Sequence, residues 1–227
     1  MKRKEDTRAN IRIYEYLRDR IVNLEYEPGQ ELNIAKLTEE MGFSRSPVRD
    51  ALLKLEEYSL VDIFPQSGTR VSYLDLDTIR QERFMRSCLE FGALEACIRK
   101  PRTDLEMEVF VTKLRSVLLK QKAALLGHSY LDFFNSDDDM HRLFYTEAGL
   151  DQCWQVLAAH TGNERRIRIL SYKAEGVADS VEREHTLLVD CIAERNVEAA
   201  LKADREHLSR LSDELDVLKA QFPQYFE

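Results

Sequence analysis

Two arginines that lie four residues apart, Arg45 and Arg49, occupy the segment 43–55, which reads FSRSPVRDALLKL. In a helix both would project from one face, and an apolar face would be formed by Val48, Ala51, Leu52 and Leu55. An arginine can donate two hydrogen bonds to guanine, and an α-helix fits the major groove of DNA. The segment therefore predicts a DNA-reading helix, although a solvated surface helix has the same pattern.

A second group of residues consists of one carboxylate and three imidazoles, Asp137, His141, His185 and His207. Asp137 and His141 are four residues apart and share a helix face. His185 and His207 lie on later helices on either side of a short turn at Asn196. Three neutral imidazoles and a carboxylate suit zinc, nickel or another first-row divalent ion. On spacing alone, surface or hydrogen-bonded histidines are the alternative.

The residues before and after the two arginines predict a helix-turn-helix. Apolar residues at helical spacing predict helices over 9–24 and 34–41. Asn33 is expected to cap the second of these and Gly42 to end it in the left-handed region. Ser44 then begins the helix that carries the arginines, so that two helices are separated by a tight turn.

After Leu60 the pattern becomes strand-like. Residues 61–64 and 69–72 are β-prone, and residues 65–68 (PQSG) form the expected hairpin loop. Three helices followed by such a hairpin describe a winged helix. Four residues of the hairpin could reach the minor groove or a phosphate, namely Gln66, Ser67, Gly68 and Arg70.

With these residues in place, the chain resembles the DNA-binding domain of the GntR family of bacterial transcription regulators. The resemblance spans about residues 8–73 and is carried by Pro28-Gly29, Leu32, Leu37, the run 42–52, Leu55, Gly68-Thr69 and Val71. It implies that Arg45 and Arg49 contact bases in double-stranded operator DNA. It also implies phosphate contacts from Ser44 and Ser46 and a minor-groove position for Gly68. Many relatives carry an Arg or Glu where this chain has Ile34 and Ala35, and Lys36 is a possible substitute.

Length and charge set the broader limits. The chain has 227 residues with 33 basic and 41 acidic side chains, a net charge of −8. Residues 1–73 hold 12 basic and 13 acidic side chains, so −7 of the net charge lies beyond them. We expect two domains, a winged helix-turn-helix over 1–74 and an all-helical domain over 75–227. The cysteines Cys88, Cys97, Cys153 and Cys191 are widely spaced and are expected to be reduced thiols. Neither a signal peptide nor a membrane span is visible, so a cytoplasmic protein is expected.

The second domain is predicted to be an antiparallel bundle of helices, and the fold class is therefore mainly α. Helices are expected over 76–99, 104–126, 129–147, 150–174, 177–195 and 197–219. Thr103 and Ser129 are expected to be N-caps.

Several runs in this domain resemble the FCD domain, the helical effector-binding domain of the FadR branch of GntR regulators. They are Arg86–Glu90, Asp137–Leu143, Glu184–Ile192, Ala199-Ala200 and His207-Leu208, within about residues 80–212. Metal-binding FCD domains use one Asp and three His as ligands, and Asp137, His141, His185 and His207 match all four. By the same resemblance Arg86 lies near a small organic acid effector, although a salt bridge to Glu82 or Glu90 is the alternative. Arg165, Arg166 and Arg168 are further candidates for that role.

These observations predict a homodimeric transcription regulator, with repression the expected sign, which binds a palindromic operator and responds to a metal-bound carboxylate. The ion could instead be the signal itself, which would make the protein a metal sensor. A metal-dependent enzyme is the weaker alternative, because the cluster lacks an evident nucleophile or general base and leaves the winged helix unexplained.

Overall fold

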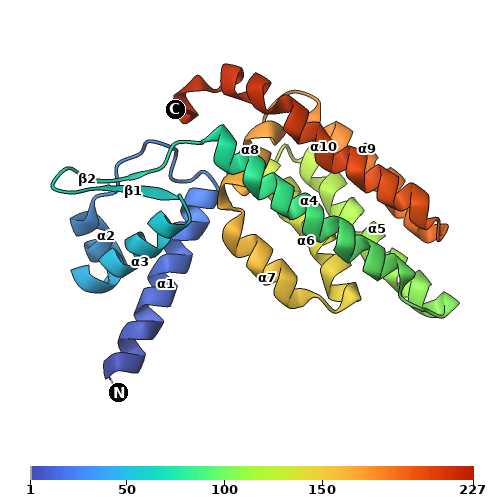
Figure 1. Cartoon of the computed structure of the whole chain (residues 1–227), viewed down its shortest axis with the longest axis horizontal. Coiled ribbons are helices and arrows are strands. Elements are labelled where there is room, and N and C mark those ends of the chain that lie inside the picture. The colour runs from blue at the N-terminus through green and yellow to red at the C-terminus, as the bar shows by residue number, and fades with distance from the viewer. Residues whose placement is uncertain (1) are drawn as a thin grey trace. The chain divides into compact units, whose positions relative to one another are not determined.

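The computed structural model of the protein describes the backbone of residues 2–227 and the side chains from Ala9 onward. Over this range the chain forms ten α-helices, one two-stranded sheet and a terminal 3-10 turn (Figure 1). This confirms the predicted fold class. The chain divides into two compact units. The first comprises the residues up to Ile79 with segments 162–167 and 219–227, and the second comprises 80–161 and 168–218.

Three helices begin the first unit. They are α1 (Lys2–Val22), α2 (Ile34–Met41) and α3 (Arg45–Glu57). Asn33 caps α2 as predicted, because its side-chain oxygen accepts a hydrogen bond from the Lys36 amide at 3.1 Å. Gly42 ends α2 with φ of 68°, a left-handed conformation that costs glycine little. Ser44 precedes α3 in an extended conformation, but its side chain forms no capping hydrogen bond.

The wing is an antiparallel hairpin of β1 (Val61–Phe64) and β2 (Gly68–Val71), in which Val61 lies opposite Val71 and Phe64 opposite Gly68. β2 thus begins and ends one residue earlier than the predicted 69–72. Beyond the hairpin, Leu74 forms an isolated bridge with the chain end, because its amide donates to the Tyr225 carbonyl at 2.8 Å and Phe226 is buried beside it.

The core of the first unit joins the apolar faces of α1 and α3. Ile13, Leu17 and Ile21 of α1 are fully buried with Val48 and Leu55 of α3, and Ala51 and Leu52 are buried beside them. The apolar face predicted for the segment 43–55 is therefore confirmed. Burial of each such side chain stabilises the fold by roughly 1.5–3 kcal/mol and fixes which face of α3 remains in solvent.

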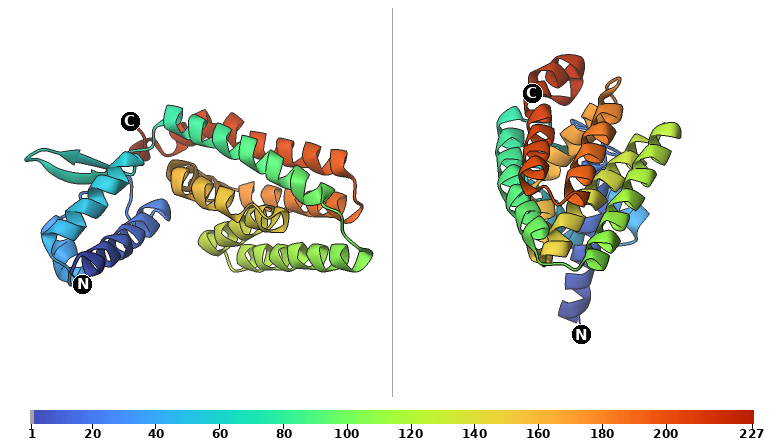
Figure 2. Two further views of the ribbon diagram at one scale, coloured as in Figure 1. Left: turned by 60° about the horizontal axis from the view of Figure 1, so that its bottom comes forward. Right: turned by 90° about the vertical axis from the view of Figure 1, so that its right-hand side faces the viewer.

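The remaining helices belong mainly to the second unit, except that the first half of α8 is part of the first. They are α4 (Leu76–Arg99), α5 (Asp104–Leu126), α6 (Tyr130–Ala148), α7 (Asp151–His160), α8 (Gly162–Tyr172), α9 (Val177–Ala193) and α10 (Val197–Gln221). Thr103 and Ser129 cap α5 and α6 as predicted. Figure 2 shows the helices of this unit packed as a bundle, in which α5 packs on α6 and α9.

The single helix predicted over 150–174 is wrong, because the chain breaks between α7 and α8. Thr161 has φ of −117° and ψ of 43°, which are not helical, and its hydroxyl donates to the Leu157 carbonyl at 2.8 Å. A Cβ at Gly162 would lie 2.9 Å from the Leu60 side chain, so glycine permits the close packing of the next helix. Helical periodicity continues across the break, and spacing alone could not reveal it.

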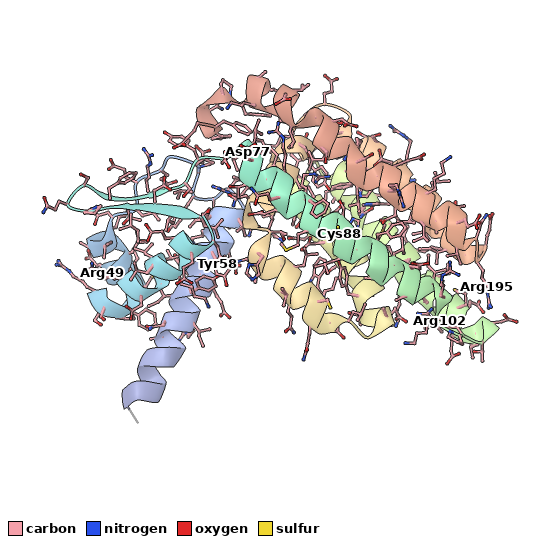
Figure 3. All side chains as sticks on the ribbon, in the orientation of Figure 1. Arg49, Tyr58, Asp77, Cys88, Arg102 and Arg195 are labelled. Carbon is pink, nitrogen blue, oxygen red and sulfur yellow. The ribbon has the colours of Figure 1, made fainter. Side chains whose placement is uncertain are left out.

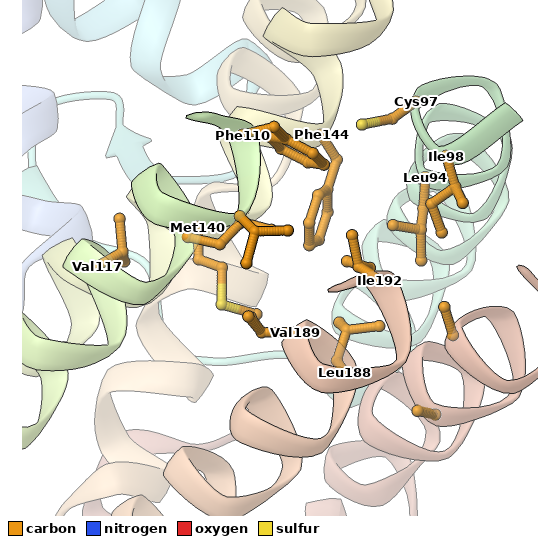
Figure 4. Packing of buried hydrophobic residues seen from close by; sticks show 14 of the residues in the cluster. Leu94, Cys97, Ile98, Phe110, Val117, Met140, Phe144, Leu188, Val189 and Ile192 are labelled. Carbon is orange, nitrogen blue, oxygen red and sulfur yellow. The ribbon is translucent and has the colours of Figure 1, made fainter. Parts of the chain in front are cut away.

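The apolar core of the second unit is built from α4, α5, α6, α9 and α10. Figure 4 shows Phe110, Met140, Phe144, Leu188 and Ile192 meeting there, and these side chains are all but inaccessible to solvent. Met140 precedes His141, so this packing fixes the helix that carries two of the predicted metal ligands. None of the described helices combines the length and the apolar character of a membrane span.

Candidate DNA-reading surface and metal centre

The solvent face of α3 carries the residues predicted to contact DNA. Ser44, Arg45, Ser46 and Arg49 are all exposed. Figure 3 shows Arg49 on the outer side of this unit. The buried face of α3 holds the helix against α1, so the arginines are presented from a fixed scaffold.

A cleft of about 670 Å³ joins α3 to the wing. Arg45 and Arg49 line one side of it, and Ser67, Gly68 and Arg70 line the other. Residues far apart in the sequence therefore meet at one surface, as a helix and wing that act together on DNA would require. Ile34 and Ala35 also line the cleft.

The Arg70 side chain contacts other side chains of the protein. Its Nε lies 3.2 Å from Asp62 Oδ2, and its Nη2 lies 3.7 Å from Glu227 Oε1. The guanidinium also stacks 4.8 Å from the centre of the Phe64 ring. A DNA contact from Arg70 would compete with these interactions, and its predicted role stays a prediction.

The four predicted metal ligands come together from three helices in the centre of the second unit. Asp137 and His141 lie on α6, His185 on α9 and His207 on α10, and one ligand atom of each lies within 4.8 Å of the others. The Nε2 atoms of His185 and His207 are 3.3 Å apart. Asp137 Oδ1 lies 3.5 Å from the His185 Nε2 and 3.8 Å from the His141 Nε2.

The outward nitrogen of each histidine ring faces an acceptor. His185 Nδ1 lies 3.0 Å from Gln121 Oε1, and His207 Nδ1 lies 2.8 Å from Glu184 Oε2. His141 Nδ1 contacts the Glu90 carboxylate. An acceptor at each Nδ1 favours the neutral tautomer that carries its proton there, and in that tautomer each Nε2 presents a lone pair to the common centre.

The pKa values of the rings favour this neutral form at two of the three positions. Burial and the neighbouring rings of the cluster hold the pKa values of His185 and His207 well below the ordinary 6.5. At His141, burial lowers the pKa, but the Glu90 and Asp137 carboxylates together raise it by more, so the net shift is upward. Burial also opposes ionisation of Glu90, yet His141 and Arg86 keep its pKa below the usual range. Glu90 is thus the charged partner that orients His141.

Asp137 is held by two further side chains. The Tyr172 hydroxyl donates to Asp137 Oδ1 at 2.8 Å, and Arg168 Nη1 lies 3.2 Å from Oδ2. Burial raises the pKa of Asp137. Arg168 also donates to Asp138 Oδ1 at 2.5 Å, which fixes the guanidinium between the two carboxylates.

The structure separates the four candidate effector arginines. Arg168 lies at the cluster, whereas Arg165 bonds Asn23 at 2.8 Å and Arg166 bonds the Ser72 carbonyl at 2.7 Å, both within the first unit. Arg86 Nε donates to Glu90 Oε2 at 3.0 Å, which is one of the two salt bridges considered from the sequence. Both partners are buried.

Sequence reasoning did not predict which side chains hold the metal ligands. Glu90 was named from the sequence, but only as a possible salt-bridge partner of Arg86. Gln121, Tyr172 and Glu184 were not predicted to belong to the site. Gln121 could have been found, because it is a lone amide on the apolar face of α5. Glu184 directly precedes His185 in the sequence, yet it bonds His207.

Comparison with known proteins agrees with the geometry. Residues 10–71 match the family described as bacterial regulatory proteins of the gntR family, and residues 84–210 match the FCD domain. An uncharacterized HTH-type transcriptional regulator of Streptomyces ambofaciens is 33% identical over 224 residues, which cover 96% of this chain and 90% of the relative. The chain belongs to the GntR family. This GntR regulator is also 26% identical to the HTH-type transcriptional repressor RspR of Escherichia coli (strain K12), over 96% of this chain and 93% of that protein.

Solved structures share the fold of this GntR regulator. Escherichia coli McbR/YncC superposes with a TM-score of 0.75 at 17% identity, covering 94% of this chain and 98% of that one. A GntR regulator from Rhodococcus sp. RHA1 has a TM-score of 0.74 at 17% identity, covering 96% and 99%. The protein is thus a DNA-binding transcription regulator with a winged helix and an FCD domain, rather than an enzyme.

Proposed function

We propose that this GntR regulator holds a divalent transition metal, zinc or nickel, at Asp137, His141, His185 and His207, and that a small carboxylic acid binds the ion as the effector. The observation that carries the proposal is the direction of the three histidines. Each Nδ1 faces an acceptor, so in the neutral form of the rings three Nε2 lone pairs and a carboxylate point at one centre. Lone pairs this close repel unless a cation lies between them.

The distances support an ion of this size. Ligands bound to zinc at about 2.0–2.1 Å in a tetrahedron lie about 3.3 Å from one another. The separation of 3.3 Å between His185 and His207 Nε2 fits, and the 3.5 and 3.8 Å separations from Asp137 Oδ1 need only a small closure. His141 Nε2 has no hydrogen-bond partner among the described residues, as expected of an atom that would bind an ion.

An ion that accepts five or six ligands keeps positions for a carboxylate after the four side chains have bound. The carboxylate would complete the coordination shell, and a buried guanidinium would balance its charge. Arg86 is the proposed partner, and Arg168 is a second cation at the cluster.

For DNA binding, we infer that Arg45 and Arg49 read bases, that Ser44 and Ser46 bind phosphates, and that Gly68 and Arg70 lie at the minor groove. A homodimer would present two such surfaces to a palindromic operator in the cytoplasm. The side chain of Phe84 on α4 is 74% exposed, which supports a dimer contact on the helical unit. Repression is the proposed sign, and effector binding would change operator affinity.

A thermal-shift screen tests the proposed effector class. Small carboxylic acids are added to zinc-loaded, nickel-loaded and chelated protein, with the His185→Ala variant as the control. We expect metal to raise the melting temperature and one group of acids to raise it further only when metal is present. The same acids should not shift His185→Ala. If the acids raised the melting temperature of chelated protein as much as that of metal-loaded protein, the proposal would be contradicted. Operator affinity that follows metal concentration without any acid effect would favour a metal sensor.

A further inference from the structure

A second buried polar group lies beside the His141 ring, next to the proposed metal centre. It includes Glu90 of α4 and Asp204 of α10, and one atom of each lies within 4.8 Å of the other and of His141. The side chains of Glu90, His141 and Asp204 are fully buried, as is Tyr145 on α6. The group shares His141 with the metal centre and otherwise uses different residues.

Asp204 has no partner for either carboxylate oxygen within the described part of the chain. The Tyr145 hydroxyl, buried in the same region, also has none. Glu90 contrasts with them, because it is bonded to Arg86 and to His141. Burying a carboxylate without hydrogen bonds lowers the stability of a fold by roughly several kcal/mol. Native proteins therefore rarely keep such a group without a ligand or a functional reason.

The charged groups in this region indicate what kind of ligand would bind Asp204 and Tyr145. Two carboxylates, Glu90 and Asp204, face one guanidinium, Arg86, whose Nε is committed to Glu90. His141 directs Nδ1 at Glu90 and adds no charge in the neutral form that binds metal. Asp204 thus has no hydrogen-bonded cation among the described residues, and the Tyr145 hydroxyl nearby has no hydrogen-bond partner there either. A protonated amine matches this arrangement, because its three N–H groups can donate to the Asp204 oxygens and to Tyr145 Oη.

Asp204 also borders a route from solvent. It lines a cleft of about 620 Å³ between α4 and α10, together with Ser87 and Arg83. The polar head of a small ligand could therefore reach Asp204 from the surface and extend toward the ion.

We propose that Asp204 and Tyr145 form the amine subsite of the effector pocket, so that the effector of this regulator is a small amino acid rather than a simple carboxylic acid. Its carboxylate binds the ion and Arg86, and its ammonium binds Asp204. This inference rests on the proposed metal-bound carboxylate, and it adds the group that sets specificity.

Matched acids that differ only at C2 test the inference. The first series is propionate, lactate and alanine, and the second is succinate, malate and aspartate. Affinities are measured by calorimetry on zinc-loaded wild type, on Asp204→Asn and Tyr145→Phe, and on Asp213→Asn, which alters an exposed carboxylate of the same helix. We expect the amino acid of at least one series to bind wild type and Asp213→Asn at least about tenfold more tightly than its two analogues. Asp204→Asn should lose this preference, and Tyr145→Phe should reduce it.

The metal content of each variant is measured in parallel and is expected to stay at the wild-type level. Equal affinities within both series would overturn the amine subsite while leaving the metal-bound carboxylate intact. A preference that persists in Asp204→Asn would also overturn it. If no acid of either series binds zinc-loaded wild type, the proposed effector class fails, and the subsite fails with it.

Discussion

The two candidate sites of this regulator are built in opposite ways. The DNA-reading surface consists of exposed side chains on a helix whose other face is buried, and Arg45 and Arg49 come from one short segment. The four ligand side chains of the candidate metal centre are buried, they come from three helices, and each is held by another side chain. The first site thus depends on local sequence and the second on tertiary structure.

This difference bears on what each site can do. Exposed arginines keep their full charge and can exchange water for DNA, so their contribution is sensitive to salt. Buried histidines are fixed in one tautomer and one direction before any ion arrives, which reduces the cost of binding. A substitution on the DNA-reading surface should therefore remove one DNA contact and leave the others in place. A substitution in the metal centre should disturb the other ligands as well.

The largest effect is expected when a ligand is removed from the buried centre. His185→Ala should weaken zinc binding by more than about 100-fold, which is the upper range for loss of a ligand's partner alone. Equilibrium dialysis against zinc measures this effect. His160→Ala removes an exposed histidine and should retain the wild-type affinity. Equal losses in both variants would contradict the assignment of the cluster.

The next largest effect concerns the exposed site. Arg49→Ala should weaken binding to a duplex selected by the wild-type protein by about 10- to 100-fold, because one base-reading contact carries about 1–3 kcal/mol. Fluorescence anisotropy measures the affinity. The protein should remain folded and should bind zinc normally. Arg195→Ala, an exposed arginine of the helical unit, is the control. Unchanged binding by Arg49→Ala would refute the role of α3.

The DNA-reading surface lies in one local segment and the metal centre depends on tertiary structure, and this difference explains how much of each site the sequence could predict. Arg45, Arg49 and the apolar face of α3 lie within one helix, so helical spacing was sufficient. Asp137 and His141 were paired for the same reason, and His185 was paired with His207 across the turn at Asn196. Family resemblance then favoured a metal site over hydrogen-bonded histidines. The acceptor of His185 is Gln121, which lies 64 residues away, and no periodicity relates them.

A smaller effect is expected from the partners of the metal ligands. Gln121→Leu keeps the size of the side chain but removes the acceptor for His185 Nδ1. Zinc affinity should fall by about 10- to 100-fold. Competition with a chromogenic chelator measures the change. Lys120→Leu alters the preceding, exposed position and should have little effect. If Gln121→Leu binds zinc as wild type does, the tautomer argument fails.

The buried histidines also predict how stability depends on pH in chelated protein. His185 and His207 have lowered pKa values when folded, so the unfolded chain binds more protons below its ordinary pKa of 6.5. The free energy of unfolding should therefore decrease as pH falls below about 6.5. Urea titrations between pH 7.5 and 5.5 measure it. The His185→Gln/His207→Gln variant should show a weaker dependence, and an equal slope would contradict the lowered pKa values.

The smallest effect compares two helix starts in the DNA-binding unit. Asn33 forms a capping hydrogen bond and Ser44 does not. Asn33→Ala should lower the free energy of unfolding by about 1 kcal/mol, whereas Ser44→Ala should leave it nearly unchanged. Denaturant titrations compare the two variants. Ser44→Ala should still weaken DNA binding through the lost phosphate contact. Equal destabilisation would show that Ser44 caps α3 in solution.

The most direct test of the metal centre is the zinc K-edge X-ray absorption spectrum of the loaded protein. The account predicts a first shell of nitrogen and oxygen atoms at about 2.0–2.1 Å, with the multiple scattering of three imidazole rings. A shell that contains sulfur at about 2.3 Å, or one without imidazole scattering, would contradict the assignment of Asp137, His141, His185 and His207.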